Sequence, residues 1–595
     1  MAVSPELDTE GPVRLAVLSE GQAVGDDVQF YEVHVRRAVG MVPSAVLVVE
    51  DGEMPTGAWP VANAATFKPG SAITIKAGYG DTEDTIFEGI VVKLGVRISG
   101  ENLSRLYVHC QDKAVKMTVG RRSANYVDQK DSAIISKLIG DHGLSADVDT
   151  TTTEYGELVQ YYCSDWDFVM SRAEVNGLLV IPDNGKVSVK APATSQAADL
   201  KVTWGVDLVE FHAEVDARGQ LSDVTALAWD PKTQAVATAT ASPLSGTGQG
   251  NLSAGTLAGV VGASSYTLQS AGAIEASALK SWATAQQVKA ELSKIRGRMK
   301  FQGSAKTKVG GTIELAGVGD RYNGKVFVGG LEHEIIDGNW FTEVDFGLPG
   351  TWFAERPDVV APPAAGWLPG AEGLQVGVVI KLDGDPKGEQ RIQVKVPVLR
   401  AETEGVWARL AQYFASKDFG AFYVPEVGDE VVLGYFNNDP SNPVILGSLY
   451  SSNRAPPYVL DKENNIKALV TRSKSRFEID DKNVVITLTT PAKNKIVIDD
   501  KDKSILLSDE HGNTIKMNAS GITLDSPGDI KLTAKGSITL DATAAIGLTA
   551  KADVTAKGLN ITAEAQVGLT AKGVATAELS ASGQTTVRGA MVMIN

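Results

Sequence analysis

An eight-residue repeat runs from about Ile496 to Asn595 and constrains the fold of this chain more than any other feature. Isoleucine or valine returns at every eighth position from Ile522, and leucine keeps the same period from Leu524. A small residue such as Gly528 precedes each pair by two positions. Because apolar residues two positions apart have the period of a β-strand, each repeat predicts one short strand followed by a corner.

The repeat assigns a place to each of its apolar residues. The predicted core is formed by Ile522, Leu524, Ile530, Leu532, Ile538, Leu540, Ile546, Leu548, Val554, Ile561 and Leu569. The predicted corners are Ser520, Gly528, Gly536, Ala544 and Ala552. We then expect the register to slip by three residues and to resume as Leu559, Val567 and Ala575 beside Ile561, Leu569 and Ala577.

One chain alone cannot close a coil around this repeat. Eight residues at about 3.3 Å each give a perimeter of roughly 26 Å, which makes a triangle with sides of roughly 9 Å. Packed sheets need about 10 Å between their faces, so such a coil has no room for side chains. Three chains that share each layer triple the perimeter and leave space for one apolar row from each chain. We therefore expect an intertwined, triple-stranded β-helix in a homotrimer, which also closes the open strand edges.

Three other structures for the repeat fit the sequence less well. Calcium-binding nonapeptide coils need a Gly-Gly-x-Gly-x-Asp pattern, which the repeat lacks, and hexapeptide coils have a different period. A disordered tail rich in alanine, threonine, lysine and glycine is the third alternative, but disordered segments do not keep apolar pairs in register.

Charge and rare residue types exclude several classes of function. The 595-residue chain has a formal net charge of −16, which argues against nucleic-acid binding because phosphate contacts need clustered lysine and arginine. Cys110, Cys163 and the six histidines show no CxxC, HxH or HExxH spacing, so we expect no metal site and no cofactor. Residues 1–12 lack a signal-peptide pattern, and no apolar run could span a membrane, so we expect assembly in a bacterial cytoplasm.

The first part of the chain predicts two β-barrels with helical insertions. Residues 13–110 and 303–336 alternate short apolar runs with glycine turns, as barrel strands do. Between them, residues 131–140 predict a helix capped by Asp131, and a second helix opens at Asp165 and stops at Asn176-Gly177. An amphipathic helix should run from about Leu279 to Ile295 and close at Gly297. Residues 235–265, rich in alanine, serine, threonine and glycine, predict a flexible surface loop.

Few residues here suggest catalysis. Asp165 and Asp167 form a carboxylate pair, but a capping residue and a solvated helix face explain them better. His333 stands alone before a strand, where a histidine usually serves the structure. We expect no enzyme.

Residues 374–450 predict a five-stranded barrel of the OB type, which follows a proline-rich linker over residues 357–373. Its turns are defined by Pro425, Gly428, Asp429, Asp439, Pro443 and Gly447. OB barrels often bind oligonucleotides or sugars, but the strands here show no basic face studded with aromatic residues, so a structural role is expected.

Several stretches together resemble a known family. The runs FKPGSAITIKAGYG and IFEGIVVKL, the helix in SDWDFVMSRAEVNGLLV, and the segment YVPEVGDEVVLGYFNNDPSNPVILGSLY are similar to those of VgrG-like spikes of contractile injection systems. The resemblance implies a tail-hub-like domain over residues 1–356, the OB domain, a linker with transition strands over residues 451–480, and the trimeric spike over residues 481–595. Residues 477–507 predict irregular strands spaced about ten residues apart, which lead into the spike. The chain departs from phage spikes that carry a lysozyme domain, because residues 451–465 are too few to form an enzyme.

The resemblance also implies a function. Two related barrels in each of three copies make a ring of six, which can adapt a six-fold inner tube to a three-fold needle. The implied partners are the inner tube and baseplate proteins, possibly effector cargo, the target membrane in passing, and a PAAR-repeat tip protein bound at Met591, Val592, Met593, Ile594 and Asn595. The spike would pierce a target envelope. The segment FEIDDKNVVITLTTPAKNKIVIDD favours an extracellular injection particle, with a type VI secretion spike or a phage tail spike as the alternatives.

Two other classes of function stay open. An enzyme that acts on glycans would need a convincing pair of carboxylates, and the sequence offers none. A trimeric receptor-binding adhesin would place aromatic residues near its distal end, yet no aromatic residue follows Phe477.

Overall fold

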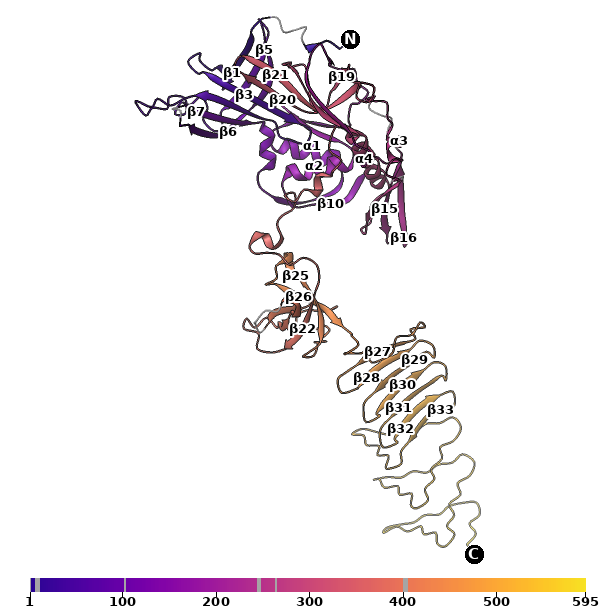
Figure 1. Ribbon diagram of the computed structural model, residues 1–595. Helices are drawn as coiled ribbons and strands as arrows, with labels where there is room; N and C mark the ends of the chain where they lie inside the picture. The colour runs from indigo at the N-terminus through magenta and orange to yellow at the C-terminus, as the bar shows by residue number, and fades with distance from the viewer. Residues whose placement is uncertain are drawn as a thin grey trace. The chain divides into compact units, whose positions relative to one another are not determined.

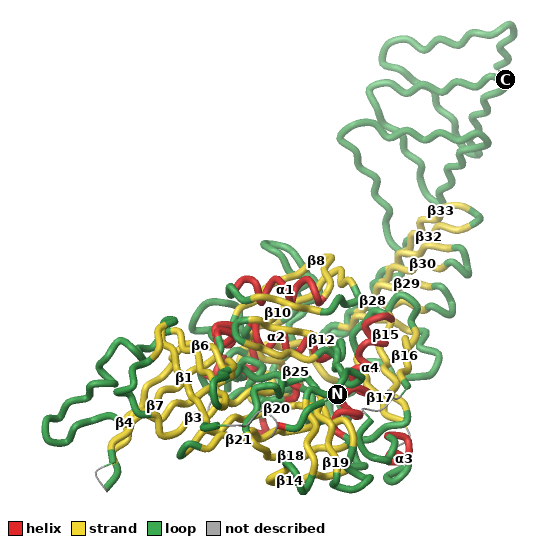
Figure 2. The backbone as a smooth tube through the Cα atoms, turned by 90° about the horizontal axis from the view of Figure 1, so that it is seen from above, coloured by secondary structure: helices red, strands yellow, loops and turns green. Residues whose placement is uncertain are grey.

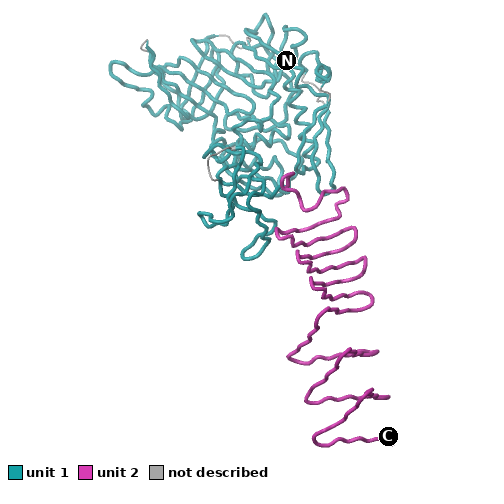
Figure 3. Tube along the Cα trace, turned by 60° about the horizontal axis from the view of Figure 1, so that its bottom comes forward, with its two compact units in different colours: residues 1–449 teal, residues 450–595 magenta. Residues whose placement is uncertain are grey.

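Strands dominate the computed structural model, which describes residues 2–5, 11–100, 103–242, 248–262, 265–399 and 405–594. The chain divides into two compact units, Met1–Leu449 and Tyr450–Asn595 (Figure 3). The predicted mainly β fold is therefore confirmed. No helix in the described ranges is both long enough and apolar enough to cross a membrane.

A 13-stranded sheet forms the main part of the first unit (Figures 1 and 2). Its strands in spatial order are β14 (Leu208–Val215), β18 (Ile295–Gln302), β21 (Asn339–Phe346), β20 (Gly324–Ile336), β3 (Phe30–Ala38), β4 (Ser44–Glu50), β7 (Ser104–Gln111), β6 (Asp84–Ile98), β5 (Ala72–Tyr79), β1 (Val13–Ser19) and β2 (Gln22–Ala23). Outside this order, β13 (Leu200–Thr203) pairs with β19 (Thr312–Ala316), which pairs with β20.

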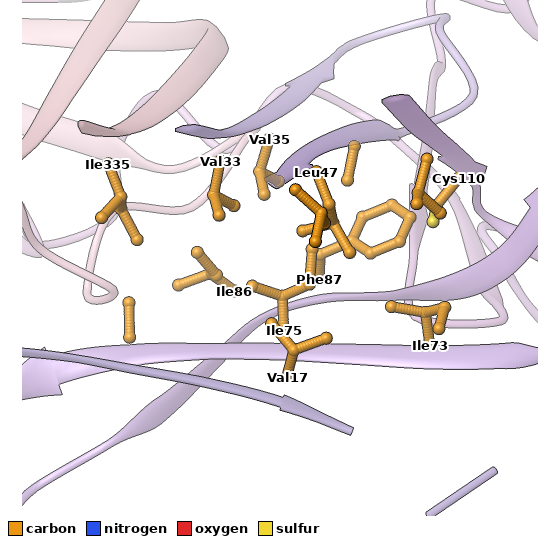
Figure 4. Packing of buried hydrophobic residues seen from close by; sticks show 14 of the residues in the cluster. Val17, Val33, Val35, Leu47, Ile73, Ile75, Ile86, Phe87, Cys110 and Ile335 are labelled. Atoms are coloured by element: carbon orange, nitrogen blue, oxygen red, sulfur yellow. The ribbon is translucent and has the colours of Figure 1, made fainter. Parts of the chain in front are cut away.

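The strands of both predicted barrels belong to this one sheet. The reason is the length of β20, whose thirteen residues pair with β3 as well as with β19 and β21. Two separate apolar cores still pack against it. The first contains Val33, Leu47 and Phe87, and Figure 4 shows Ile335 of β20 beside Val33 and Val35.

The second core lies at the other end of the sheet. It is formed by Leu200, Val202, Ile295, Met299, Phe301, Ile313, Leu315, Val326, Val328, Leu331, Val344 and Phe346. The sheet therefore holds two apolar cores side by side in one protomer.

A helical layer with two small sheets follows β7. Its elements are η2 (Lys113–Thr118), β8 (Arg122–Lys130), α1 (Asp131–Asp141), β9 (Ser145–Val148), β10 (Glu154–Cys163), α2 (Asp165–Val175), β11 (Leu179–Asp183) and β12 (Lys186–Lys190). The N-cap of α2 is Ser164, whose hydroxyl accepts a hydrogen bond from the Asp167 amide at 3.1 Å.

The prediction that Asp131 caps α1 is wrong. Lys130 occupies the cap position, and Asp131 is fully buried in the first turn. The Asp131 carboxylate instead accepts two hydrogen bonds from Arg172, at 2.7 and 2.9 Å, and one from Asn176 at 2.8 Å. A buried carboxylate needs such a charged partner, so Asp131 ties α1 to α2 instead of capping.

The predicted loop over residues 235–265 is only partly a loop. Residues 235–241 form β16 (Ala235–Ala241), which pairs with β15 (Asp223–Asp230), and β17 (Ser265–Ser270) pairs with the other side of β15. Between them lies the short helix α3 (Ala254–Ala258), while residues 243–247 and 263–264 lie outside the described residues. Alanines of β15 pack on α4 (Ala276–Ser293), so small residues serve a tight sheet–helix contact here.

Helix α4 ends two residues before the predicted Ile295. Ile295 instead begins β18, and Gly297 lies inside that strand. A Cβ atom at Gly297 would stand 2.1 Å from the carbonyl oxygen of His212. The glycine is therefore required by close strand approach and does not terminate the helix.

The predicted OB barrel is confirmed as a closed five-stranded barrel. Its strands are β22 (Gln375–Lys381), β23 (Ile392–Lys395), β24 (Val406–Leu410), β25 (Glu430–Tyr435) and β26 (Pro443–Leu449), with η3 (Phe353–Glu355) and η4 (Pro363–Gly366) before it and η5 (Pro397–Leu399) and η6 (Phe436–Asn438) within it.

The second unit opens with a seven-stranded antiparallel meander (Figure 1). Its strands are β27 (Ile466–Val470), β28 (Arg476–Asp480), β29 (Val485–Thr489), β30 (Lys495–Asp499), β31 (Ser504–Ser508), β32 (Thr514–Asn518) and β33 (Gly521–Asp525). The prediction of irregular transition strands is wrong, because every strand has five residues and pairs in register with the next.

Two histidines of the first unit should give its stability opposite dependences on pH. His333 is buried, its Nδ1 lies 3.0 Å from the Thr342 hydroxyl, and burial lowers its pKa to about 3, with Arg37 contributing. Glu332, and then Glu32, raise the pKa of half-buried His34 against the opposing effect of burial. Below pH 6.5 an unfolded His333 binds a proton that the folded state excludes, so stability falls with falling pH by at most about 1.4 kcal/mol per pH unit.

We predict that His333→Leu flattens this loss between pH 6.5 and 5 and that His34→Gln steepens it, since protonated His34 stabilises the fold on the acid side. Urea denaturation followed by tryptophan fluorescence measures both, because all nine tryptophans precede Tyr450. Parallel pH profiles for the wild type and the His333→Leu variant would contradict this assignment.

Candidate trimerisation surface

One face of the meander is apolar except at Lys467 of β27, which pairs with Ile479. Two rows of side chains follow the cross-strand pairs, and together we call them the apolar face. The first row is Leu469, Phe477, Leu488, Ile496, Leu507, Ile515 and Leu524. The second row is Ile479, Ile486, Ile498, Ile505, Met517 and Ile522.

The opposite face of the meander is mostly polar. Its polar residues are Arg476, Glu478, Asp480, Thr487, Thr489, Lys495, Asp499, Ser504, Ser508, Thr514, Lys516, Asn518, Thr523 and Asp525, and its apolar residues are Ile466, Ala468, Val470, Val485, Val497 and Leu506. Alternation along each strand therefore separates an apolar side from a mostly polar side.

Nothing within one protomer covers the apolar face. Among the described residues from 450 to 594, not one is buried. Phe477 is 36% exposed, and Leu488 is 48% exposed. Burying apolar surface stabilises a protein by about 25 cal/mol per Å², so a row of this length favours association with another surface.

The octad repeat continues the two rows beyond the meander. Ile522 and Leu524 lie in β33, and Ile530 with Leu532 follow eight residues later. The predicted corners Gly528, Gly536, Ala544 and Ala552 all lie in backbone bends, so the eight-residue spacing of corners is confirmed. Every described side chain of the predicted prism core is more than half exposed in the single chain, and its position inside a prism stays a prediction.

The predicted three-residue slip in the repeat is wrong. The bend after residue 552 comes at Leu559, one residue early, and later bends return to the eight-residue spacing at 566–567 and 574–575. Leu559 and Val567 are fully exposed at these corners. Gly558 and Asn560 flank Leu559 and favour a turn there, which the apolar pattern alone concealed.

The backbone after β33 lacks strand partners from its own chain. Across the described residues 526–594 no strand is recorded, although the segments between bends are extended (Figures 2 and 3). Extended backbone exposes N–H and C=O groups that strands normally satisfy in a ladder. Pairing with other copies of the chain would supply that ladder.

The OB motif residues form two turns of the barrel. Gly428 adopts φ +86°, its amide donates to the Val379 carbonyl at 2.7 Å, and the Asp429 carboxylate accepts from the Glu426 amide at 2.8 Å. Asp439 accepts from the Ser441 amide and the Asn442 side chain, both at 2.8 Å.

The remaining motif residues are Pro425, in the loop before β25, and Pro443 and Gly447 of β26. Pro425 and Pro443 are buried, and Gly447 pairs with Val432 in the barrel wall. The whole motif thus lies in turns and strands of the barrel, as turn chemistry suggests.

The candidate carboxylates hold the structure together. Asp165 accepts hydrogen bonds from Arg122 Nε at 2.6 Å and Gln160 Nε2 at 2.9 Å, and it lies 2.8 Å from His142 Nε2. Burial alone would raise the Asp165 pKa, but these partners lower it. Its partner in the pair, Asp167, donates its amide to the helix cap. A lone charge-paired carboxylate of this kind serves packing between elements.

The Cys110 thiol and the possible metal ligands also offer no reactive centre among the described residues. Burial raises the pKa of the Cys110 thiol to about 12, which makes it a poor nucleophile. Within the described ranges no group of three or more His, Cys, Asp or Glu side chains is placed to hold a metal ion.

Two exposed apolar surfaces were not fully predicted from the sequence. The spacing of about ten residues before Ile522 was predicted, but not the regular apolar face, which the alternation in KIVID and SILLS signals. The second is a loop of exposed aromatic residues over residues 412–423 of the OB domain, which the stretch QYFASKDFGAFY signals. The predicted tip residues Met591, Met593 and Ile594 are exposed, and Asn595 lies outside the described residues.

Comparisons with known proteins agree with this arrangement. Residues 9–337 match the Alg8 N-terminal domain, residues 375–450 match the type VI secretion system/phage-baseplate injector OB domain, and residues 483–547 match the phage baseplate V C-terminal trimerisation domain. The first of these matches spans more than half of the chain.

The relatives of this chain include type VI secretion system spike proteins. VgrG1b of Pseudomonas aeruginosa is 27% identical over 207 residues, which is 32% of this chain and 26% of that protein. VgrG2a of the same species is 32% identical over 114 residues, or 17% of this chain and 13% of that protein. The matched region thus spans about a quarter or less of each relative.

Solved structures give remote similarities. A 43 kDa tail protein of prophage MuSo2 from Shewanella oneidensis has a TM-score of 0.44 and 11% identity, over 57% of this chain and 98% of that protein. An Escherichia coli component of the type VI secretion system has a TM-score of 0.37 and 12% identity, over 73% and 99%.

The apolar face, the closed OB barrel and the three domain matches lead to one conclusion. The chain belongs to the family of the Alg8 N-terminal domain, contains segments that match an injector OB domain and a baseplate trimerisation domain, and resembles VgrG spike proteins.

Proposed function

We propose that three copies of this chain form the central spike of a contractile injection system that mechanically pierces a target envelope. The observation that carries this proposal is the apolar face of the second unit, which is uncovered in one protomer and coincides with the match to a trimerisation domain. Beyond β33, a prism of three intertwined chains would share its ladders between copies. No copy can peel away without breaking two interfaces at once.

The first unit would join this spike to a tube. Its two apolar cores in one protomer would give six similar elements in a trimer, which suits a six-fold tube above a three-fold needle. Inner tube and baseplate proteins are then the partners of this domain, and the division into hub, linker, OB domain and spike is part of the same proposal.

A mechanical task needs no catalytic centre. Asp165 and Asp131, the buried carboxylates of the helical layer, are engaged in ion pairs, and His333 is enclosed in the sheet. We therefore assign no enzymatic step to this chain.

The kind of machine is a narrower proposal. The segment over residues 477–500 resembles extracellular injection particles, and we place the spike in such a particle. The similarity to VgrG1b and VgrG2a supports the alternative of a type VI secretion spike. If intact particles in cell-free culture fluid contain this chain, the extracellular injection particle is favoured. If the chain is found only in cell-attached machines, the type VI secretion spike is favoured.

A pair of neighbouring substitutions tests the trimer. Ile498 lies on the apolar face, whereas Val497 lies on the opposite face of the same strand β30. We predict that Ile498→Lys reduces the native mass of the full chain to that of a monomer, because three buried ammonium groups would meet near one axis. Val497→Lys should leave a trimer.

Light scattering on both variants decides the matter. A trimer for Ile498→Lys, or dissociation by Val497→Lys to the same extent, would contradict the proposed packing of this face.

Residues 591–595 form the proposed tip-binding segment. Met591, Val592, Met593 and Ile594 are exposed apolar residues, and in a trimer they would form a hydrophobic patch that favours a cap. A PAAR-repeat protein is the proposed cap.

We predict that deleting residues 591–595 lowers the affinity for a PAAR-repeat protein at least 100-fold while the native mass stays that of a trimer. Binding measured by surface plasmon resonance, with light scattering as the control for assembly, tests this. Full affinity of the shortened trimer would show that the tip binds elsewhere.

A further inference from the structure

The OB domain presents a hairpin of aromatic residues that its own barrel does not cover. The hairpin spans residues 412–423, between β24 and β25, and we call it the aromatic hairpin. Its two arms are joined by hydrogen bonds from the Ala421 amide to the Phe414 carbonyl at 2.8 Å and from the Ser416 amide to the Phe419 carbonyl at 3.0 Å. The Gln412 side chain closes its base by donating to the Tyr423 carbonyl at 2.7 Å. The hairpin is therefore an ordered projection.

The rings of the aromatic hairpin contact one another and leave most of their surface open. Tyr413 stacks on Tyr423 with ring centroids 6.4 Å apart, and Phe414 meets Phe419 at 5.8 Å. Tyr413 is 84% exposed, and Phe422 is 88% exposed. Aromatic side chains gain much from burial, so a projection with these rings is suited to insertion into another surface.

A second apolar surface lies on the outside of the same barrel. Leu446 is the extra residue of a β-bulge in β26, because Val432 pairs with Gly447 and Leu433 pairs with Ile445. The bulge turns Leu446 outward, where it is 52% exposed, and Leu374 just before β22 is 65% exposed.

Glycine at position 434 keeps the space between these two leucines open. A Cβ atom there would stand 3.2 Å from Leu446 and 3.9 Å from Leu374. We call Leu374, Val376, Gly434 and Leu446 the apolar wall. It lies on β22, β25 and β26 and the residue before β22, whereas the aromatic hairpin lies between β24 and β25, so the domain carries two separate apolar surfaces.

Two different surfaces on one domain are what a three-fold ring requires. In a two-fold dimer one patch meets itself, whereas a cyclic trimer joins one patch to a different patch on the next copy. We propose that the aromatic hairpin of each OB barrel docks on the apolar wall of the neighbouring copy. This inference rests on the proposed function, because it takes the trimer as given.

The chain also keeps the three barrels near one another. Residues 450–465 connect Leu449 of β26 to Ile466 of β27, and sixteen extended residues span at most roughly 55 Å. Barrels tethered to one trimeric spike meet at an effective concentration on the order of millimolar. The contact between the aromatic hairpin and the apolar wall can therefore form in the assembled spike even if its intrinsic affinity is modest.

Site-specific photocrosslinking in the full chain tests the contact. Benzoylphenylalanine in place of Phe422 preserves an aromatic ring at an exposed position. After illumination we expect covalent dimers and trimers on a denaturing gel, with crosslinks that map by mass spectrometry to the apolar wall of a second copy. Benzoylphenylalanine in place of Trp367, which is also exposed, serves as the positional control and should give no such product.

Two further variants sharpen the result. Leu446→Asp should lower the yield of the crosslinked product at least five-fold, whereas Lys395→Asp, on β23 outside the apolar wall, should leave it unchanged. Light scattering on the same samples separates two failures. The proposed docking is wrong if the protein is trimeric but gives no crosslinks or only crosslinks within one chain. It is also wrong if the crosslinks join a sugar, a lipid or another segment. Monomeric protein overturns the proposed function itself.

Discussion

Unsatisfied backbone hydrogen bonds are the constraint on which the rest of this structure depends. Each extended segment after β33 carries amide and carbonyl groups without a partner in its own chain. In water such a segment would be disordered, and in a folded state the groups need a ladder. The octad spacing of apolar pairs leaves only other copies of the same repeat as neighbours with matching register. Trimerisation would thus be the folding step of this segment and not a later association.

The meander prepares that step within each chain. Its seven strands already satisfy one another, so one protomer can form them alone, and they align two apolar rows that the octads continue. A sheet with a large uncovered apolar face favours association with another surface. Three such sheets facing one axis would bury all of their rows, and they would hold the following residues in the register that intertwining needs. The ion-paired helical layer and the long strand β20 give the first unit a separate, self-sufficient core.

Patterns of fixed period predicted the structure best. The octad corners, the five OB strands and the second helix follow from the sequence because local spacing and turn residues determine them. The role of Asp131 was predicted wrongly because it depends on Arg172, which is distant in the sequence. The end of the helix near Ile295 was predicted wrongly because Gly297 serves a close approach between strands. The register after residue 552 was predicted wrongly because the apolar pattern does not distinguish a leucine at a corner, such as Leu559, from a leucine in the core. The aromatic hairpin escaped notice because its rings gather in a loop and follow no strand period.

Amide hydrogen exchange of residues 526–594 in the purified full chain tests the central claim most directly. If three chains share ladders there, these amides should exchange orders of magnitude more slowly than those of an unpaired chain, because opening requires strands of other copies to separate. Slow exchange together with a trimeric native mass is the predicted result. Exchange at the rate of a disordered peptide in a trimeric sample would contradict an intertwined spike and would confine the trimer contact to the meander.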